Sequence, residues 1–192
     1  MSKVAIMGSG SWGTALGMVM ADAGGDVALW AREAEVVESI NTQHVNERYH
    51  PGLDLPVNMW ASSDPKEVIE GAKIVVLAIP SQTLRENLSN WKQYLDPDAV
   101  IVSLMKGIEI GTVMRMSQVI SDVAGVPESR VAILSGPNLA REIAQRQPAA
   151  TTVACTSEES AQRLAEATTT SYFRPYYTTD VVGAEIGGSV KN

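Results

Sequence analysis

The sequence is poor in cysteine and histidine. Among its 192 residues there are one cysteine and two histidines. The single cysteine, Cys155, excludes an internal disulfide and a metal site built on thiolates, and the sequence predicts no other metal site. Its apolar neighbours, Val153 and Ala154, predict that Cys155 is a small buried side chain.

The sequence also lacks a long apolar run and an excess of positive charge. No apolar stretch approaches the roughly 18 residues that span a bilayer. The N-terminal residues enter a strand without a charged-then-apolar leader. The formal net charge of −7 argues against nucleic acid or an anionic membrane as a main partner. We therefore expect a globular protein in a reduced, cytoplasmic setting, without stable membrane insertion.

Strand and helix patterns alternate along the chain. This alternation predicts an α/β, Rossmann-like, doubly wound fold: a mostly parallel sheet with helices on both faces. A polar, irregular stretch that contains His44 and His50 interrupts the alternation. Strands are expected at 3–7, 27–30, 74–79, 100–104, 131–134, 150–154 and 173–177, and helices at 12–23, 34–41, 65–70, 81–91, 112–124, 139–145 and 158–168.

A glycine turn, Gly8-x-Gly10-x-x-Gly13, directly follows the first predicted strand and opens the first predicted helix. In a dinucleotide-binding turn the first glycine permits the tight bend, and the second lets the backbone approach a pyrophosphate. The third lets helix and strand pack closely, and the helix N-terminus faces the anion. A structural turn is the alternative, but the strand–turn–helix context favours a dinucleotide site.

An arginine stands at the end of the second strand, about 20 residues beyond the glycines. NAD-specific domains place an acidic residue there, whereas Arg32 suits a ribose 2′-phosphate through a charge-assisted pair. Glu33 is adjacent, so a slip of one residue would change an NADP site into an NAD site. The sequence therefore favours NADPH and leaves NADH open, with a solvated strand end as the remaining interpretation of Arg32.

Three further loops follow later strands of the predicted sheet. They are Pro80-Ser81-Gln82, Lys106-Gly107-Ile108-Glu109 and Ser135-Gly136-Pro137-Asn138. Ligands of open α/β sheets lie outside the carboxyl ends of the strands, so these loops could offer a lysine charge and an amide to one molecule. Each is equally well interpreted as a simple turn.

The last ten residues, Gly183 to Asn192, are mostly small and predict a helix that packs tightly against a partner element. Lys191 would lie on the early part of that helix. Because the sequence stops there without a cap, we expect a dinucleotide-binding domain at 1–182 and the start of a truncated helical domain at 183–192.

The ordered set of motifs is similar to one known family. The chain resembles the N-terminal domain of bacterial NAD(P)-dependent glycerol-3-phosphate dehydrogenase over essentially all of its residues. Single segments are unspecific, whereas the ordered set is highly specific. The matching segments are 8–15, 29–32, 46–51, 78–81, 106–109, 135–138 and 187–192.

The resemblance implies hydride transfer between sn-glycerol 3-phosphate and dihydroxyacetone phosphate, which feeds phospholipid synthesis. It is compatible with a homodimer of the full-length enzyme. Lys191 would be the general acid/base, and other phosphate-binding groups would lie in a helical C-terminal domain. Asn138 replaces a more usual Thr or Ser, and Ser189 a more usual Ala. Cofactor contacts would come from Gly8, Gly10, Ser11, Trp12, Gly13, Arg32, Tyr49, Pro80, Lys106 and Ala140, and substrate contacts from Lys106, Gly136, Asn138 and Lys191.

The implied chemistry is coherent with the residues present. Reduction of a ketone needs a hydride donor and a proton donor to the forming alkoxide. A lysine whose pKa is lowered by a second cation, here Lys106, fits the donor role better than His44 or His50. We expect this chain to bind NADPH with little or no turnover by itself.

Two other functions stay open. A β-hydroxyacid dehydrogenase shares the glycine turn and a late Lys-Asn pair, although Gly136-Pro137-Asn138 and Trp30-Ala31-Arg32 count against it. A non-catalytic NAD(P)-binding module would bind the cofactor, and addition of the missing domain in trans would have no effect.

Overall fold

The computed structural model describes residues 2–190. Eight strands form one sheet in the order β3-β2-β1-β4-β5-β6-β7-β8. All neighbouring strands are parallel except β6 and β7, which run antiparallel. The mostly parallel sheet confirms the predicted fold class. The strands are β1 Lys3–Met7, β2 Asp26–Trp30, β3 Met59–Ser62, β4 Ile74–Leu77, β5 Val100–Ser103, β6 Val131–Ser135, β7 Ala149–Ala154 and β8 Phe173–Thr178.

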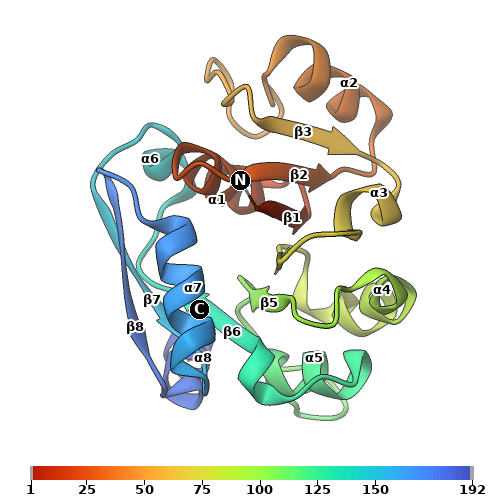
Figure 1. Ribbon diagram of the computed structural model, residues 1–192, viewed down its shortest axis with the longest axis vertical. Coiled ribbons are helices and arrows are strands. Elements are labelled where there is room, and N and C mark those ends of the chain that lie inside the picture. Colours follow the sequence, from red (N-terminus) through yellow and green to blue (C-terminus); the bar gives the residue numbers. More distant parts are fainter. Residues whose placement is uncertain (1, 191–192) are drawn as a thin grey trace.

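Helices cover both faces of the sheet (Figure 1). Helices α1, α2, α6 and α7 contribute buried side chains to one core, and α3, α4 and α5 contribute to the other. No helix within residues 2–190 is long and apolar enough to cross a membrane. The helices are α1 Ser11–Asp22, α2 Ala34–Gln43, α3 Pro65–Ile69, α4 Leu84–Trp91, α5 Met116–Ala124, α6 Ala140–Ala144, α7 Glu158–Thr168 and α8 Val181–Val190, with short 3-10 turns at Ser81–Thr83, Lys92–Tyr94 and Glu128–Arg130.

The central strands are apolar on both sides because each face carries its own core. In β4, Ile74 and Val76 belong to one core, whereas Val75 and Leu77 belong to the other. A strand buried on both faces therefore reads as a continuous apolar run instead of an alternating one. This apolar run is why the sequence predicts β4.

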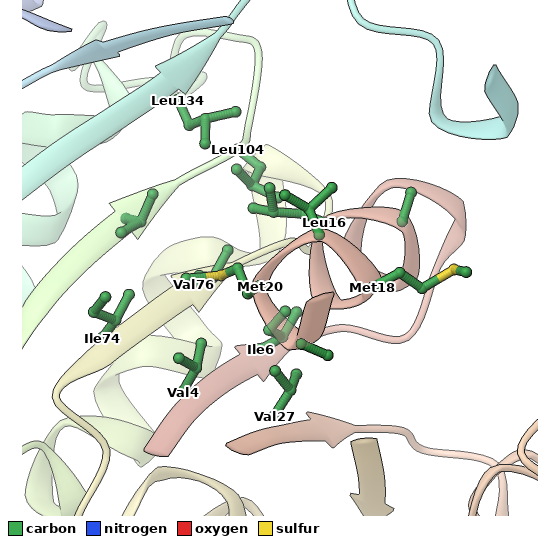
Figure 2. Close-up of a cluster of buried hydrophobic side chains, with 14 of the residues drawn as sticks. Val4, Ile6, Leu16, Met18, Met20, Val27, Ile74, Val76, Leu104 and Leu134 are labelled. Atoms are coloured by element: carbon green, nitrogen blue, oxygen red, sulfur yellow. The ribbon is translucent and has the colours of Figure 1, made fainter. Parts of the chain in front are cut away.

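Helix α1 is fixed against the sheet by its apolar face. Leu16 and Met20 belong to the same core as Ile6 and Val76, and Figure 2 shows these side chains gathered between the helix and the strands. Each fully buried side chain of this size contributes about 1.5–3 kcal/mol. The packing holds the N-terminus of α1 in place after β1.

Two elements differ from the sequence expectations. Strand β3, residues Met59–Ser62, was not expected, and it pairs with β2 at the edge of the sheet. The helix predicted at 112–124 begins at Met116 because residues 108–115 form a turn instead. In that turn the Glu109 N–H donates to the Met114 carbonyl oxygen, and Val113 has a φ of 60°.

Two predicted helix starts are confirmed by their caps. The Asp64 carboxylate accepts the Lys66 N–H at 2.8 Å, with Pro65 at the first helical position of α3. The Ser157 hydroxyl accepts the Ser160 N–H at 3.2 Å at the start of α7. Helix α8 begins at Val181, close to the expected domain boundary at 182/183. That boundary stays a prediction.

Candidate functional site

The sheet reverses its strand order between β1 and β4. The chain builds β1, β2 and β3 outward on one side and then returns to place β4 on the other side of β1. The connections that leave the carboxyl ends of β1 and β4 therefore run to opposite faces of the sheet, toward α1 and α4, and open α/β sheets bind their ligands at such a point. Gly8 follows β1 there, and Ala78 follows β4.

The three glycines of the turn have three different reasons to lack a side chain. Gly8 has a φ of +134°, and a Cβ on it would collide with the Ala78 carbonyl oxygen. A Cβ on Gly13 would collide with the Gly8 carbonyl oxygen, so Gly13 permits the close contact of α1 with β1. A Cβ on Gly10 would meet no atom within 4 Å. Only the Gly10 position faces open space, which fits the approach of a pyrophosphate.

The N-terminus of α1 is open to an anion. Gly10 is the N-cap residue and provides no side-chain cap, and the first turn contains no acidic residue. The first N–H groups of a helix have no partner within the helix, and the helix dipole adds a partial positive charge there. A negatively charged group beside Gly10 would satisfy both.

A buried pair of side chains holds the glycine turn from behind. The Asn46 amide donates to the Ser9 carbonyl oxygen at 3.0 Å and to Thr14 Oγ1 at 2.9 Å. His50 Nε2 donates to the Ser11 carbonyl oxygen at 2.8 Å. Asn46 and His50 are 1% and 2% exposed. The polar stretch that looked irregular in the sequence thus contains two side chains that set the shape of the site.

One pocket opens on the β2 side of the glycine turn, with a volume of about 320 Å³. We call it the Arg32 pocket. It brings together four groups of residues that are separate in the sequence: the glycine turn, the end of β2, Tyr49 from the polar stretch, and the segment after β4. Its lining residues are Gly8, Ser9, Gly10, Trp30, Arg32, Glu33, Tyr49, Ala78, Ile79, Pro80, Thr83 and Asn87.

A second pocket, of about 250 Å³, opens beyond the carboxyl ends of β5 and β6. We call it the Lys106 pocket. It contains one residue of α1, Trp12, so α1 reaches both pockets through its first turn and its cap. Its lining residues are Trp12, Leu104, Lys106, Leu134, Ser135, Gly136, Asn138 and Ala140.

The Asn138 side chain explains the glycine at position 136. Asn138 Nδ2 donates to the Ala150 carbonyl oxygen at 2.8 Å, which fixes the orientation of the amide. A Cβ on Gly136 would lie 2.7 Å from Asn138 Oδ1 and 3.2 Å from Thr151 Oγ1. The Oδ1 atom is buried and has no hydrogen-bond partner among residues 2–190. Gly136 and Asn138 therefore act as one unit at the edge of the Lys106 pocket.

The loop that carries Lys106 is anchored from α4 and the turn before it. The Gln82 amide donates to the Ile108 carbonyl oxygen at 2.9 Å and accepts the Ile110 N–H at 3.0 Å. Arg85 makes two hydrogen bonds of 2.9 Å to the Glu109 carboxylate. The Arg85 guanidinium holds the pKa of Glu109 below its ordinary value. These contacts restrict the loop although it lies at the surface.

Helix α8 is attached to α5 through a buried carboxylate. Glu185 is 7% exposed and accepts the Ser117 N–H at 2.8 Å, and it also contacts the Arg115 guanidinium. The attachment places the end of α8 beside the Lys106 pocket, where a Cβ on Gly188 would lie 2.8 Å from Ser135 Oγ. Lys191, the predicted general acid/base, lies outside the described residues.

The structure places the predicted residues that it describes at two pockets, both of which include a residue from the N-terminal end of α1 or its cap. Gly8, Gly10, Arg32, Tyr49 and Pro80 line the Arg32 pocket. Five others, Trp12, Lys106, Gly136, Asn138 and Ala140, line the Lys106 pocket, while Ser11 and Gly13 belong to α1 between them. Sequence reasoning gave no role to Asn46, His50, Gln82 and Glu185. The last of these had one signal, a lone carboxylate in a helix of small residues.

Known proteins match this chain over nearly all of its residues. Residues 3–161 match the family described as NAD-dependent glycerol-3-phosphate dehydrogenase N-terminus. The glycerol-3-phosphate dehydrogenase [NAD(P)+] of Streptomyces griseus is 58% identical over 190 residues, which are 99% of this chain and 56% of the relative. The enzyme of the same name from Thermobifida fusca is 56% identical over 193 residues, which are 100% of this chain and 57% of the relative.

A solved structure supports the same relationship. The crystal structure of glycerol-3-phosphate dehydrogenase from Coxiella burnetii superposes with a TM-score of 0.90 at 33% identity, covering 99% of this chain and 57% of that one. The chain therefore spans a little more than half the length of the relatives that it matches.

Proposed function

This chain belongs to the NAD-dependent glycerol-3-phosphate dehydrogenase family, whose N-terminal domain it matches, and we propose that it binds a nicotinamide cofactor in the following way. A nicotinamide dinucleotide lies across the Arg32 pocket and the Lys106 pocket, with its pyrophosphate beside Gly10. NADPH is preferred over NADH. The open space at Gly10, at an uncapped helix N-terminus between two pockets, is the observation that supports this proposal best.

Cofactor preference is assigned to Arg32. Its side chain lines the pocket at the end of β2 and makes no ion pair within residues 2–190. A guanidinium that has no carboxylate partner can bind a ribose 2′-phosphate through two parallel hydrogen bonds. Tyr49, 39% exposed in the same pocket, supplies a ring surface beside it.

For a chain of the relatives' full length, we propose interconversion of sn-glycerol 3-phosphate and dihydroxyacetone phosphate in the cytoplasm. The bound nicotinamide supplies or accepts the hydride. Protonated Lys191 donates the proton to the forming alkoxide, and the positive charge of Lys106 favours the release of that proton. Gly136 and Asn138, which line the Lys106 pocket, contact the substrate. The net charge of −7 argues against nucleic acid as a partner, so a small phosphorylated substrate relies on local positive groups such as Lys106.

One pair of titrations tests the cofactor assignment. NADPH and NADH are titrated separately against the chain and against Arg32→Ala, with fluorescence as the readout. Arg32→Ala should weaken NADPH about tenfold or more and leave NADH nearly unchanged, because only NADPH loses a charge-assisted contact. Arg174→Ala, an exposed arginine on the distant strand β8, is the control. Equal losses for both cofactors would contradict a 2′-phosphate contact.

Turnover is tested separately in a chain of the relatives' full length. Lys191→Met should abolish NADPH oxidation by dihydroxyacetone phosphate and keep the affinity for NADPH. A variant that oxidises NADPH at the original rate would exclude Lys191 as the proton donor.

A further inference from the structure

An ion pair lies at the Arg32 pocket. The cofactor contacts proposed for the glycine turn and for Arg32 do not involve it. Arg48 Nη1 lies 3.4 Å from Glu33 Oε1, and the Arg48 guanidinium carbon lies 5.6 Å from the centre of the Tyr49 ring. Both partners of Arg48, Glu33 and Tyr49, line the Arg32 pocket. The guanidinium is therefore held between two residues of the pocket wall.

Fold stability does not account for this pair. The side chains of Arg48 and Glu33 are 55% and 33% exposed, and solvent screens exposed pairs of this kind, so they add little to stability. The backbone around Arg48 is nevertheless well fixed. Asn46 and His50, on either side of Arg48, are buried and bonded to the glycine turn, and the Tyr49 and His50 N–H groups donate to the Asn46 carbonyl oxygen. The turn thus presents Arg48 from a rigid base.

The charge of Glu33 matters for the cofactor. Glu33 lines the same pocket one residue after Arg32, next to the position where an acidic side chain accepts a hydrogen bond from a free ribose 2′-hydroxyl. An unpaired carboxylate there would favour NADH, and it would repel a 2′-phosphate that carries close to two negative charges. A carboxylate held by Arg48 does neither to the same degree.

We propose that Arg48 is a second specificity-determining residue of this pocket, beyond Arg32. It occupies the Glu33 carboxylate and adds a positive charge to the wall, so that the pocket favours a ribose 2′-phosphate over a 2′-hydroxyl. Arg32, Glu33 and Arg48 together bring two positive charges and one negative charge to this pocket. This inference rests on the proposed cofactor site.

The test uses equilibrium binding of NADPH and NADH to the chain and four variants. Arg48→Ala should weaken NADPH binding about tenfold, through one lost cation and one released carboxylate, and should leave the NADH affinity unchanged or raise it. Glu33→Gln should weaken NADH and leave NADPH within about threefold. The double variant should recover part of the NADPH affinity lost in Arg48→Ala, because the repelling carboxylate is gone. Arg48→Lys should keep more NADPH affinity than Arg48→Ala.

Arg174→Ala is a matched control for Arg48→Ala. The Arg174 guanidinium carbon lies 5.5 Å from the centre of the Tyr176 ring, so its removal breaks the same kind of cation–ring contact on the distant strand β8. It should leave both affinities unchanged. Thermal unfolding of each variant shows whether the fold is kept.

The outcomes separate this inference from the proposed function. If the unchanged chain binds neither cofactor, both fail. If Arg32→Ala discriminates between the cofactors and Arg48→Ala behaves like Arg174→Ala, the inference on Arg48 fails alone. It also fails if Arg48→Ala weakens NADPH and NADH equally, because Arg48 would then support a part of the pocket that both cofactors share.

Discussion

Replacement of Gly10 by alanine should separate cofactor binding from folding. A Cβ on Gly10 meets no atom within 4 Å, and its φ of −70° is open to any residue. Glycine is better than alanine at a helix N-cap by about 0.5–1 kcal/mol. Alanine returns about 0.4–1 kcal/mol because it lowers the conformational entropy of the unfolded chain. The free energy of unfolding should therefore change by less than about 1 kcal/mol.

The effect on the cofactor should be much larger. The added Cβ would occupy the space through which a pyrophosphate approaches the N-terminus of α1. A hydrogen bond to a charged group contributes about 1.5–3 kcal/mol, and the helix dipole adds about 0.3–1 kcal/mol. A loss of about 2–4 kcal/mol corresponds to affinity that is roughly 30- to 1000-fold weaker. Titration of NADPH against Gly10→Ala measures this change directly.

The same substitution at Gly13 should instead lower the free energy of unfolding clearly. There the Cβ would collide with the Gly8 carbonyl oxygen, so α1 must move away from β1. Overpacking of this kind costs about 1–3 kcal/mol, which urea unfolding followed by circular dichroism would detect. The reasoning is refuted if Gly10→Ala binds NADPH as tightly as the unchanged chain, or if it loses as much stability as Gly13→Ala.

Three further predictions concern the parts around the site. Glu185→Ala should lower the free energy of unfolding in urea by about 2–3 kcal/mol, because Arg115 and a backbone N–H lose a buried acceptor; a change under about 0.5 kcal/mol would exclude that anchoring. The Arg85 guanidinium depresses the pKa of Glu109, so this pair stabilises the fold above the ordinary pKa of 4.5 and the stability is lost as the pH falls. Between neutral pH and about pH 3, Glu109→Gln should therefore lose less stability than the unchanged chain, and equal losses would contradict this. Burial raises the pKa of the Cys155 thiol, so a thiol reagent should react slowly with the native protein at neutral pH and fully in urea.

Local rules account for the elements that the sequence predicted well. The apolar run of β4 and the Asp64-Pro65 start of α3 each act over a few neighbouring residues. Strand β3 has four residues and is defined by its pairing with β2, about 30 positions earlier. Helical spacing also continues through residues 112–115, but the bond from the Glu109 N–H to the Met114 carbonyl oxygen forms a turn there. The existence of β3 and the start of α5 thus depend on hydrogen bonds that the local sequence pattern does not predict.

The site shows the same division between local and distant contacts. Motifs identified the loops at the carboxyl edge of the sheet because each motif is a short segment after a strand. They did not identify what holds those loops, since the contacts join residues far apart in the sequence. Asn46 and His50 reach the glycine turn across 37 and 39 positions, and Gln82 reaches the Lys106 loop across 26. The sequence motifs include segments 46–51 and 80–82, but nothing local in them predicts which distant backbone groups these side chains contact.

The question of cofactor preference changes its form once these contacts are known. From the sequence, NADPH or NADH depended on whether Arg32 or Glu33 stood at the end of β2. In the fold both residues line the same pocket, so their register alone does not decide. What differs is their partners: Arg48 pairs with Glu33, whereas the Arg32 side chain makes no ion pair within residues 2–190. In the proposal above, preference for a 2′-phosphate depends on which charge is already neutralised, and therefore on Arg48, which belongs neither to the glycine turn nor to the end of β2.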